Sequence, residues 1–270
     1  MEKINTQSAD VITQLTKMAE MKNASIEQLI PFYCQERLLN RLSTSSYYDQ
    51  FYIEGDFLFF TLAEGVGMPP NELTLTAQQS AYQNDLVQQA FAEICSIKIP
   101  EDGVQFFEND IESIIMDTSI HLKIPARLGS ITTYIEVKIT FIENRVAPQI
   151  ITSPSVLDMK PAELYTYPIE YVVAQALLDI YQYPAVTSKV VLDIERVLQT
   201  QHIEGRKLQA YLEEMLDQHR LTLEVTPILE KGIVKQFFDP IYEAMVADGE
   251  FFKQWNSKEQ AWQYKYYPCE

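Results

Sequence analysis

Two runs of residues decide the fold: Glu36-Arg37-Leu38-Leu39-Asn40-Arg41-Leu42-Ser43 and, shortly after it, Phe51-Tyr52-Ile53-Glu54-Gly55-Asp56. From Ile26 through the first run, apolar side chains recur at the spacing of one helix face, and Ser25 is placed to cap that helix. Pro31 marks the start of the helix or a kink in it. The second run begins as an aromatic and β-branched strand and meets a glycine. Together they predict a helix that leads into a short strand and a glycine turn.

On both sides of these runs, the hydrophobic spacing predicts further elements. In the first part of the chain we expect helices over 8–21, 26–42 and 79–94, and strands over 51–53, 72–76, 111–116, 119–124 and 134–141. From about residue 156 prolines punctuate a helical pattern, with helices expected over 169–181, 188–201, 206–219 and 233–248. We therefore expect an α+β fold, with an α+β lobe over residues 1–155 that includes the N-terminal helices, and a helical lobe over 156–270.

The composition limits the classes of function. The 270 residues are 47% hydrophobic, which is a globular composition, and no run of about 18 apolar residues predicts a membrane span. The formal net charge of -17 disfavours nucleic acid as a partner, because nucleic-acid binding depends on basic surfaces. Cys34, Cys95 and Cys269 are far apart and form no CxxC pair, so we expect neither disulfides nor a zinc site. The start of the chain lacks a signal-peptide pattern, and we expect a cytoplasmic protein.

Several motifs, taken in order, resemble the AbiEii family of nucleotidyltransferases. The run over 36–43, with Ser45 and Tyr47, is similar to the family's ERxLxRL helix and following serine, and residues 51–55 are similar to the strand before its KGG turn. Further along, two more segments are similar to its YPxExxxAEK and KDxxDL helices: Tyr167-Pro168-Ile169-Glu170 with Ala174, and Lys189 with Asp193. The resemblance extends over roughly residues 5–200.

This resemblance implies a polymerase-β-like nucleotidyltransferase lobe with a mixed sheet. In that family the glycine-rich turn holds nucleotide phosphates, two or three carboxylates hold divalent metal ions, and basic residues of the second lobe hold the triphosphate. Family members are toxins of bacterial toxin–antitoxin and phage-defence loci, and some act on nucleotides or RNA.

The chain departs from the family pattern at the positions that carry this chemistry. The KGG turn is replaced by Glu54-Gly55-Asp56, in which both carboxylates would repel a triphosphate. Threonines, Thr74 and Thr76, occupy both aspartate positions of the RxTxDxD segment. Lys138 occupies the position of the third carboxylate, although a gap in the alignment would bring Glu136 there. Because Mg²⁺ depends on carboxylate oxygens, we expect no metal to bind at these positions.

In the second lobe the departures continue. Ala174-Gln175-Ala176 replaces the family's AEK, so the phosphate-binding lysine is missing. Lys189 and Asp193 persist and are the remaining nucleotide-binding candidates, although a pair at this spacing is equally an ordinary helix-surface pair.

The leading functional hypothesis is a degenerate, non-catalytic member of the family, a pseudoenzyme that acts by binding a partner protein, such as an antitoxin-like neighbour. It predicts no cofactor. The alternative is an active toxin that transfers a nucleotide to RNA or protein and uses Mg²⁺ and a nucleoside triphosphate. Its displaced acids would be Asp56, Glu72 and Glu136, converging within about 6 Å. A third hypothesis is a structural or assembly protein.

Other residues suggest sites only weakly. The three histidines lack metal-binding spacing, and no phosphate-binding glycine motif or serine-nucleophile motif occurs. We expect Cys34 to be a core residue rather than a nucleophile. The aromatic C-terminus, which includes Trp255, Trp262 and Tyr264, is expected to pack on its own domain, with a partner-docking strip as the alternative.

Overall fold

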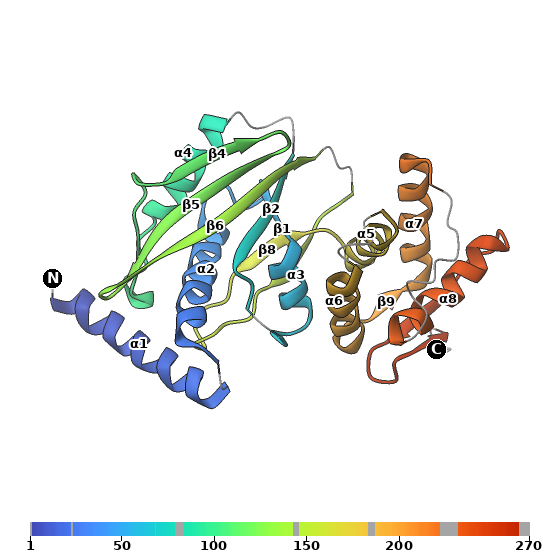
Figure 1. Cartoon of the computed structure of the whole chain (residues 1–270), viewed down its shortest axis with the longest axis horizontal. Coiled ribbons are helices and arrows are strands. Elements are labelled where there is room, and N and C mark those ends of the chain that lie inside the picture. The colour runs from blue at the N-terminus through green and yellow to red at the C-terminus, as the bar shows by residue number, and fades with distance from the viewer. Residues whose placement is uncertain are drawn as a thin grey trace, which may run out of the picture. The chain divides into compact units, whose positions relative to one another are not determined.

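The computed structural model describes residues 2–22, 24–67, 69–78, 84–142, 146–182, 187–221 and 232–264 (Figure 1). The chain divides into two compact units. Unit 1 comprises residues 1–61 and 67–166, and unit 2 comprises residues 62–66 and 167–270. The division falls later than the expected boundary at residue 155, because the strand over 163–166 pairs with the strand over 51–54 and so belongs to unit 1.

Unit 1 contains helices and a curved sheet. Its helices are α1 (Glu2–Lys22), α2 (Ile26–Thr44), α3 (Gly55–Leu62, whose last residue belongs to unit 2), α4 (Asn84–Ser96) and the short 3-10 helix η2 (Pro100–Asp102). Its strands are β1 (Phe51–Glu54), β2 (Glu72–Gln78), β3 (Val104–Phe106), β4 (Glu112–Met116), β5 (Ser119–Leu128), β6 (Ile131–Ile142), β7 (Gln149–Thr152) and β8 (Glu163–Thr166). The expected helices and strands of this unit are confirmed, except that residues 79–83 of the third expected helix lie outside the described residues.

The described strands of unit 1 form one mixed sheet in the order β3-β5-β6-β2-β1-β8-β7, with β4 also paired to β5. β1 is antiparallel to β2 and parallel to β8, while β2 is parallel to β6. Alternate residues of β2 and β6, such as Leu75 and Ile139, are buried on one face, and α2 runs along the sheet in Figure 1 and contacts β6 and β8. The opposite face carries the polar residues of the same strands, as their alternation requires.

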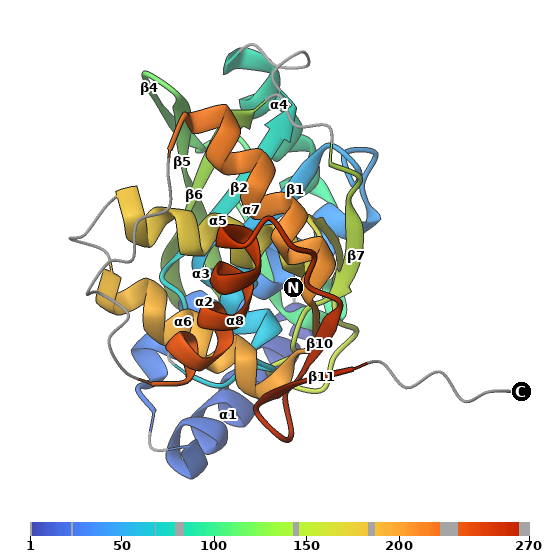
Figure 2. The same ribbon diagram turned by 90° about the vertical axis from the view of Figure 1, so that its right-hand side faces the viewer.

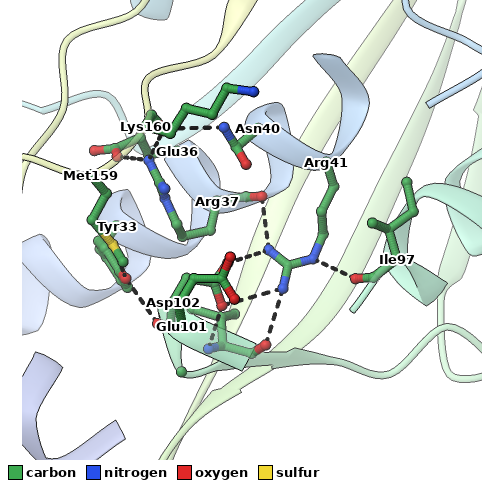
Figure 3. Close-up of polar contacts among 12 residues, drawn as sticks. Tyr33, Glu36, Arg37, Asn40, Arg41, Ile97, Glu101, Asp102, Met159 and Lys160 are labelled. Atoms are coloured by element: carbon green, nitrogen blue, oxygen red, sulfur yellow. Dashed lines mark hydrogen bonds and ion pairs between the residues drawn. The ribbon is translucent and has the colours of Figure 1, made fainter. Parts of the chain in front are cut away.

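The first run of the family resemblance lies on α2, and its polar side chains are buried and hold α2 to neighbouring loops (Figure 3). Arg41 forms an ion pair with Asp102 at 2.6 Å and donates hydrogen bonds to the backbone oxygens of Ile97 and Val104. The side chains of Arg41 and Asp102 are 1% and 0% exposed. Arg41 therefore fastens α2 to η2 and to the residues on either side of it, which is a structural role.

The same helix holds a second loop through Glu36, Arg37 and Asn40. Glu36 is ion-paired with Arg37 and accepts a hydrogen bond from the backbone N–H of Val156 at 2.7 Å. Asn40 donates to the backbone oxygen of Lys160 at 3.1 Å. One helix thus anchors the segment between β7 and β8, which lets β8 reach β1.

Unit 2 is mainly helical, with α5 (Ile169–Gln182), α6 (Thr187–Thr200), α7 (Gly205–His219) and α8 (Ile233–Val246) close to the expected bounds. A small sheet of β9 (Ile203–Glu204), β10 (Lys253–Asn256) and β11 (Ala261–Tyr264) was not expected.

Trp255 is buried, donates from Nε1 to the backbone oxygen of Leu198 at 2.8 Å, and packs against Phe237. Trp262 donates to the backbone oxygen of Phe237 at 2.8 Å. Trp255 and Trp262 therefore pack on their own unit, as expected, whereas Tyr264 is 70% exposed and residues 265–270 lie outside the described residues.

Candidate functional site

The glycine turn that the resemblance places at a nucleotide site lies between β1 and α3. Gly55 has a φ of +62°, a left-handed conformation that favours glycine. A Cβ atom at this position would lie 2.9 Å from Oγ1 of Thr74. The turn therefore needs glycine for both its conformation and its close approach to β2, so its retention is explained without any ligand.

The next feature is a row of side chains that crosses β1, β2, β6 and β5 at this turn. Glu54 pairs in register with Thr74, Thr74 pairs with Lys138, and Lys138 pairs with His121. Residues opposite one another on neighbouring strands share a face of the sheet. The positions that we aligned to the first aspartate and to the third carboxylate of the family are therefore adjacent, and they hold a hydroxyl and an ammonium group.

Thr76, at the second aspartate position, is held within the sheet. Its side chain is buried, and its Oγ1 lies 3.2 Å from Oγ1 of Thr140 on β6. Thr140 in turn lies 3.4 Å from the backbone oxygen of Leu75. This hydroxyl pair satisfies one buried and one half-buried polar group on neighbouring strands, which is a structural role.

The fallback acids lie one step further along the same face. Glu72 pairs in register with Glu136 across β2 and β6, and Glu136 pairs with Lys123 on β5. Asp56 instead lies exposed in the first turn of α3. Within the described ranges, no three His, Cys, Asp or Glu side chains are grouped so as to hold a metal ion. The structure brings two of the three fallback acids together and does not bring the third into such a group.

The donor set at the aligned positions does not fit a pair of magnesium ions. The row offers one carboxylate, on Glu54, and one ammonium group, on Lys138, with Thr74 between them, so that the formal charges of these two groups cancel. A hard divalent cation prefers several carboxylate oxygens, and a neighbouring lysine competes with it for those oxygens. The sequence carries no signal that Glu54 and His121 neighbour these positions, because only the strand register brings them into this row.

In unit 2, motif residues make hydrogen bonds and ion pairs with other residues of the same unit. Glu170, from the Tyr167-Pro168 motif, is buried, and its Oε1 accepts a hydrogen bond from the backbone N–H of Glu204 at 3.0 Å. Lys189 is exposed on α6, and Asp193 forms an ion pair with Arg196 at 3.4 Å. Glu170 thus helps to fix the segment before α7, and Lys189 and Asp193 remain candidates from the resemblance alone.

The two cysteines in the described ranges are buried thiols, as expected for Cys34. Burial raises the pKa of both Cys34 and Cys95 to about 12. Because the thiolate is the reactive form, native Cys269→Ser protein at pH 8 should react with a disulfide reagent only slowly. Both thiols should react rapidly in denaturant. Spectrophotometric thiol counting checks this, and rapid labelling of a native thiol would contradict the buried assignment.

Among the described residues, no helix has both the length and the apolar character needed to cross a membrane.

Comparison with known proteins adds the following similarities. The family model described as nucleotidyl transferase AbiEii toxin, type IV TA system, matches residues 57–264. The crystal structure of JHP933 from Helicobacter pylori is 12% identical with a TM-score of 0.41, and the alignment covers 83% of this chain and 97% of that chain. A candidate nucleotidyltransferase from H. pylori is also 12% identical with a TM-score of 0.40, covering 84% and 100% of the two chains. No curated protein matches the chain.

Proposed function

Because the chain belongs to the AbiEii nucleotidyltransferase toxin family of type IV toxin–antitoxin systems, we propose that it is a member that has lost nucleotidyl transfer and acts by binding a partner protein. The observation that carries this proposal is the register of β2 and β6, in which Lys138 lies beside Thr74 where the resemblance calls for carboxylates. The α+β architecture with its mixed sheet is that of the family's polymerase-β-like fold.

Loss of charge at these positions removes the usual source of catalysis. Phosphoryl and nucleotidyl transfer depend on metal ions that neutralise the developing negative charge, and the protein's part is mainly to place those ions. A hydroxyl at residue 74 and an ammonium group at residue 138 supply neither the charge nor the ligand oxygens. Asp56 adds a negative charge in the first turn of α3, where a phosphate would otherwise be favoured.

We place the protein in the bacterial cytoplasm, in a toxin–antitoxin or phage-defence setting, with an antitoxin-like protein as its partner. The family description names a toxin–antitoxin system, and the described cysteines are free thiols. The formal net charge of -17 favours a basic protein surface over nucleic acid as the binding counterpart. No cofactor is part of this proposal.

Isothermal titration calorimetry with ATP and with GTP, each with and without Mg²⁺, tests the loss of chemistry. We expect no metal-dependent binding at concentrations up to about 1 mM, which corresponds to a binding free energy weaker than about -4 kcal/mol. Micromolar binding that requires Mg²⁺ would overturn the proposal.

One observation favours the alternative of an active nucleotidyltransferase with displaced acids: Glu72 and Glu136 lie side by side on the exposed face of β2 and β6. In that case Glu72→Gln and Glu136→Gln would each abolish transfer of a labelled nucleotide to RNA or protein. Glu163→Gln, on the exposed side of β8, is a matched control that should leave transfer unchanged. Absence of transfer by the unaltered protein would remove the alternative.

A further inference from the structure

Strand β4 is an edge strand of the unit 1 sheet, and it exposes three consecutive apolar side chains. It pairs antiparallel with β5, and no other described strand pairs with it. Ile114, Ile115 and Met116 are 60%, 64% and 53% exposed. Ile114 and Met116 share the face of His121 and Ser119, whereas Ile115 points to the opposite face. Figure 2 shows β4 at the outer end of the sheet.

Beyond its first two residues, this edge lacks the features that usually protect a sheet edge. At its start, Gln88 on α4 donates from Nε2 to the backbone oxygen of Ile111 at 2.9 Å, and its Oε1 accepts a hydrogen bond from Oγ of Ser113 at 3.0 Å. Soluble proteins blunt such edges with lysine, proline, bulges or a covering element, because free backbone N–H and C=O groups recruit other strands. Residues 112–116 contain no lysine, arginine or proline, and two of the five are β-branched isoleucines that favour an extended conformation. From Ile114 to Met116, β4 therefore has the properties of a strand that is open for pairing.

The charges around β4 indicate which strand would pair with it. Glu112 begins β4, and Asp110 and Asp117 lie just beyond its two ends, all three exposed. Lys123 is the register partner of Glu112 and offsets one of these charges. Apolar side chains flanked by acids at both ends complement an extended segment with apolar residues between lysines or arginines.

A second copy of this chain is the less suitable occupant. It would bring the same acids to the same edge, and each chain has a net charge of -17. Affinity for a basic segment would instead combine backbone hydrogen bonds, apolar contacts and charge attraction.

We propose that β4 is a docking edge, at which an extended basic and apolar segment of a partner protein adds a strand to the sheet. This proposal rests on the proposed function, since it names the surface through which the protein binds its partner. The contact uses only unit 1, and it needs neither the glycine turn nor the residues of the Glu54-Thr74-Lys138 row.

The experiment uses the full chain and a fluorescent synthetic peptide in which valine and threonine alternate between terminal lysines. The same peptide with glutamates in place of the lysines serves as the ligand control. Binding is followed by fluorescence anisotropy, and hydrogen exchange of the β4 backbone amides is measured by mass spectrometry. We expect the lysine peptide to bind about tenfold or more tightly than the glutamate peptide and to slow exchange in β4.

Ile114→Lys tests the edge directly, because a lysine there opposes both the apolar contact and the basic ligand. It should weaken binding of the lysine peptide by about tenfold or more. Ile150→Lys is the matched control, because Ile150 is a similarly exposed isoleucine on β7, at the other end of the sheet. This control should leave binding unchanged, and both variants should keep the thermal unfolding midpoint of the unaltered chain.

Equal binding of the two peptides, equal effects of the two variants, or no protection of β4 would overturn the proposal. Self-association of the chain that Ile114→Lys abolishes would overturn it in favour of a second copy as occupant. These outcomes are separate from the nucleotide titration. Peptide binding without nucleotide binding supports both proposals, and metal-dependent nucleotide binding refutes the loss of chemistry without touching the β4 result.

Discussion

Arg41→Ala is expected to lower the free energy of unfolding of unit 1 by about 3–5 kcal/mol, because it leaves the buried carboxylate of Asp102 without its counter-ion. The loss is compounded by the backbone oxygens of Ile97 and Val104, which would lose their donor. Urea unfolding, followed by hydrogen exchange in peptides from β5 and β6, measures the change in unit 1. Both tryptophans of the chain, Trp255 and Trp262, lie in unit 2, so tryptophan fluorescence reports that unit separately.

Arg127→Ala is the control for this variant. Arg127 is exposed on β5 and donates to Oε1 of Gln105 at 2.6 Å, so its loss should change the free energy of unfolding by no more than about 0.5 kcal/mol. An Arg41→Ala effect as small as that of the control would show that the ion pair does not hold α2 to the loop before β3. The interpretation of Arg41 as the residue that holds α2 to the segment before β3 would then be wrong.

The second large expected effect is a gain of affinity for a metal ion. The double variant Thr74→Asp/Lys138→Asp should acquire affinity for Mn²⁺, improved by roughly tenfold or more over the unaltered chain, because affinity for hard cations follows the number of carboxylate ligands. The two new carboxylates would be register partners, with Glu54 next to residue 74 on β1. Neither Thr74 nor Lys138 is fully buried, so the substitutions place no isolated charge in the core. Calorimetric titration with MnCl₂ measures the affinity.

Thr132→Asp/Lys258→Asp is the matched control, since it makes the same change in net charge at two exposed residues that belong to different units. It should bind Mn²⁺ no better than the unaltered chain. If both double variants gained affinity equally, the gain would reflect total charge, and the Thr74-Lys138 row would have no special geometry.

The helices were predictable from the sequence because their apolar residues recur at helix spacing over many turns. The exception is α3, since Gly55–Leu62 is almost wholly apolar after its first two residues and shows no periodicity that separates helix from strand. The short strands β3, β7 and β8 were missed because three or four residues are too few to show a hydrophobic period, and because β8 pairs with β1, far away in the sequence. Such non-local pairing also moved the unit boundary from residue 155 to 166.

The residue types at the candidate site could be predicted from the sequence, but their neighbours on adjacent strands could not. The threonines at 74 and 76 and the lysine at 138 are visible in the sequence once the family pattern is laid over it. Their neighbours depend on register, because a shift of one residue moves every side chain of a strand to the other face. Register is what places Lys138 between Thr74 and His121, and Glu72 beside Glu136.

Electron paramagnetic resonance of Mn²⁺ added to the unaltered chain tests the central claim most directly, because bound Mn²⁺ loses the six-line signal of the free ion. We predict that the signal of free Mn²⁺ rises in proportion to the metal added, with no saturable site tighter than about 1 mM. Saturable loss of signal at micromolar Mn²⁺, restored by Glu72→Gln or Glu136→Gln, would contradict the account and identify those acids as metal ligands.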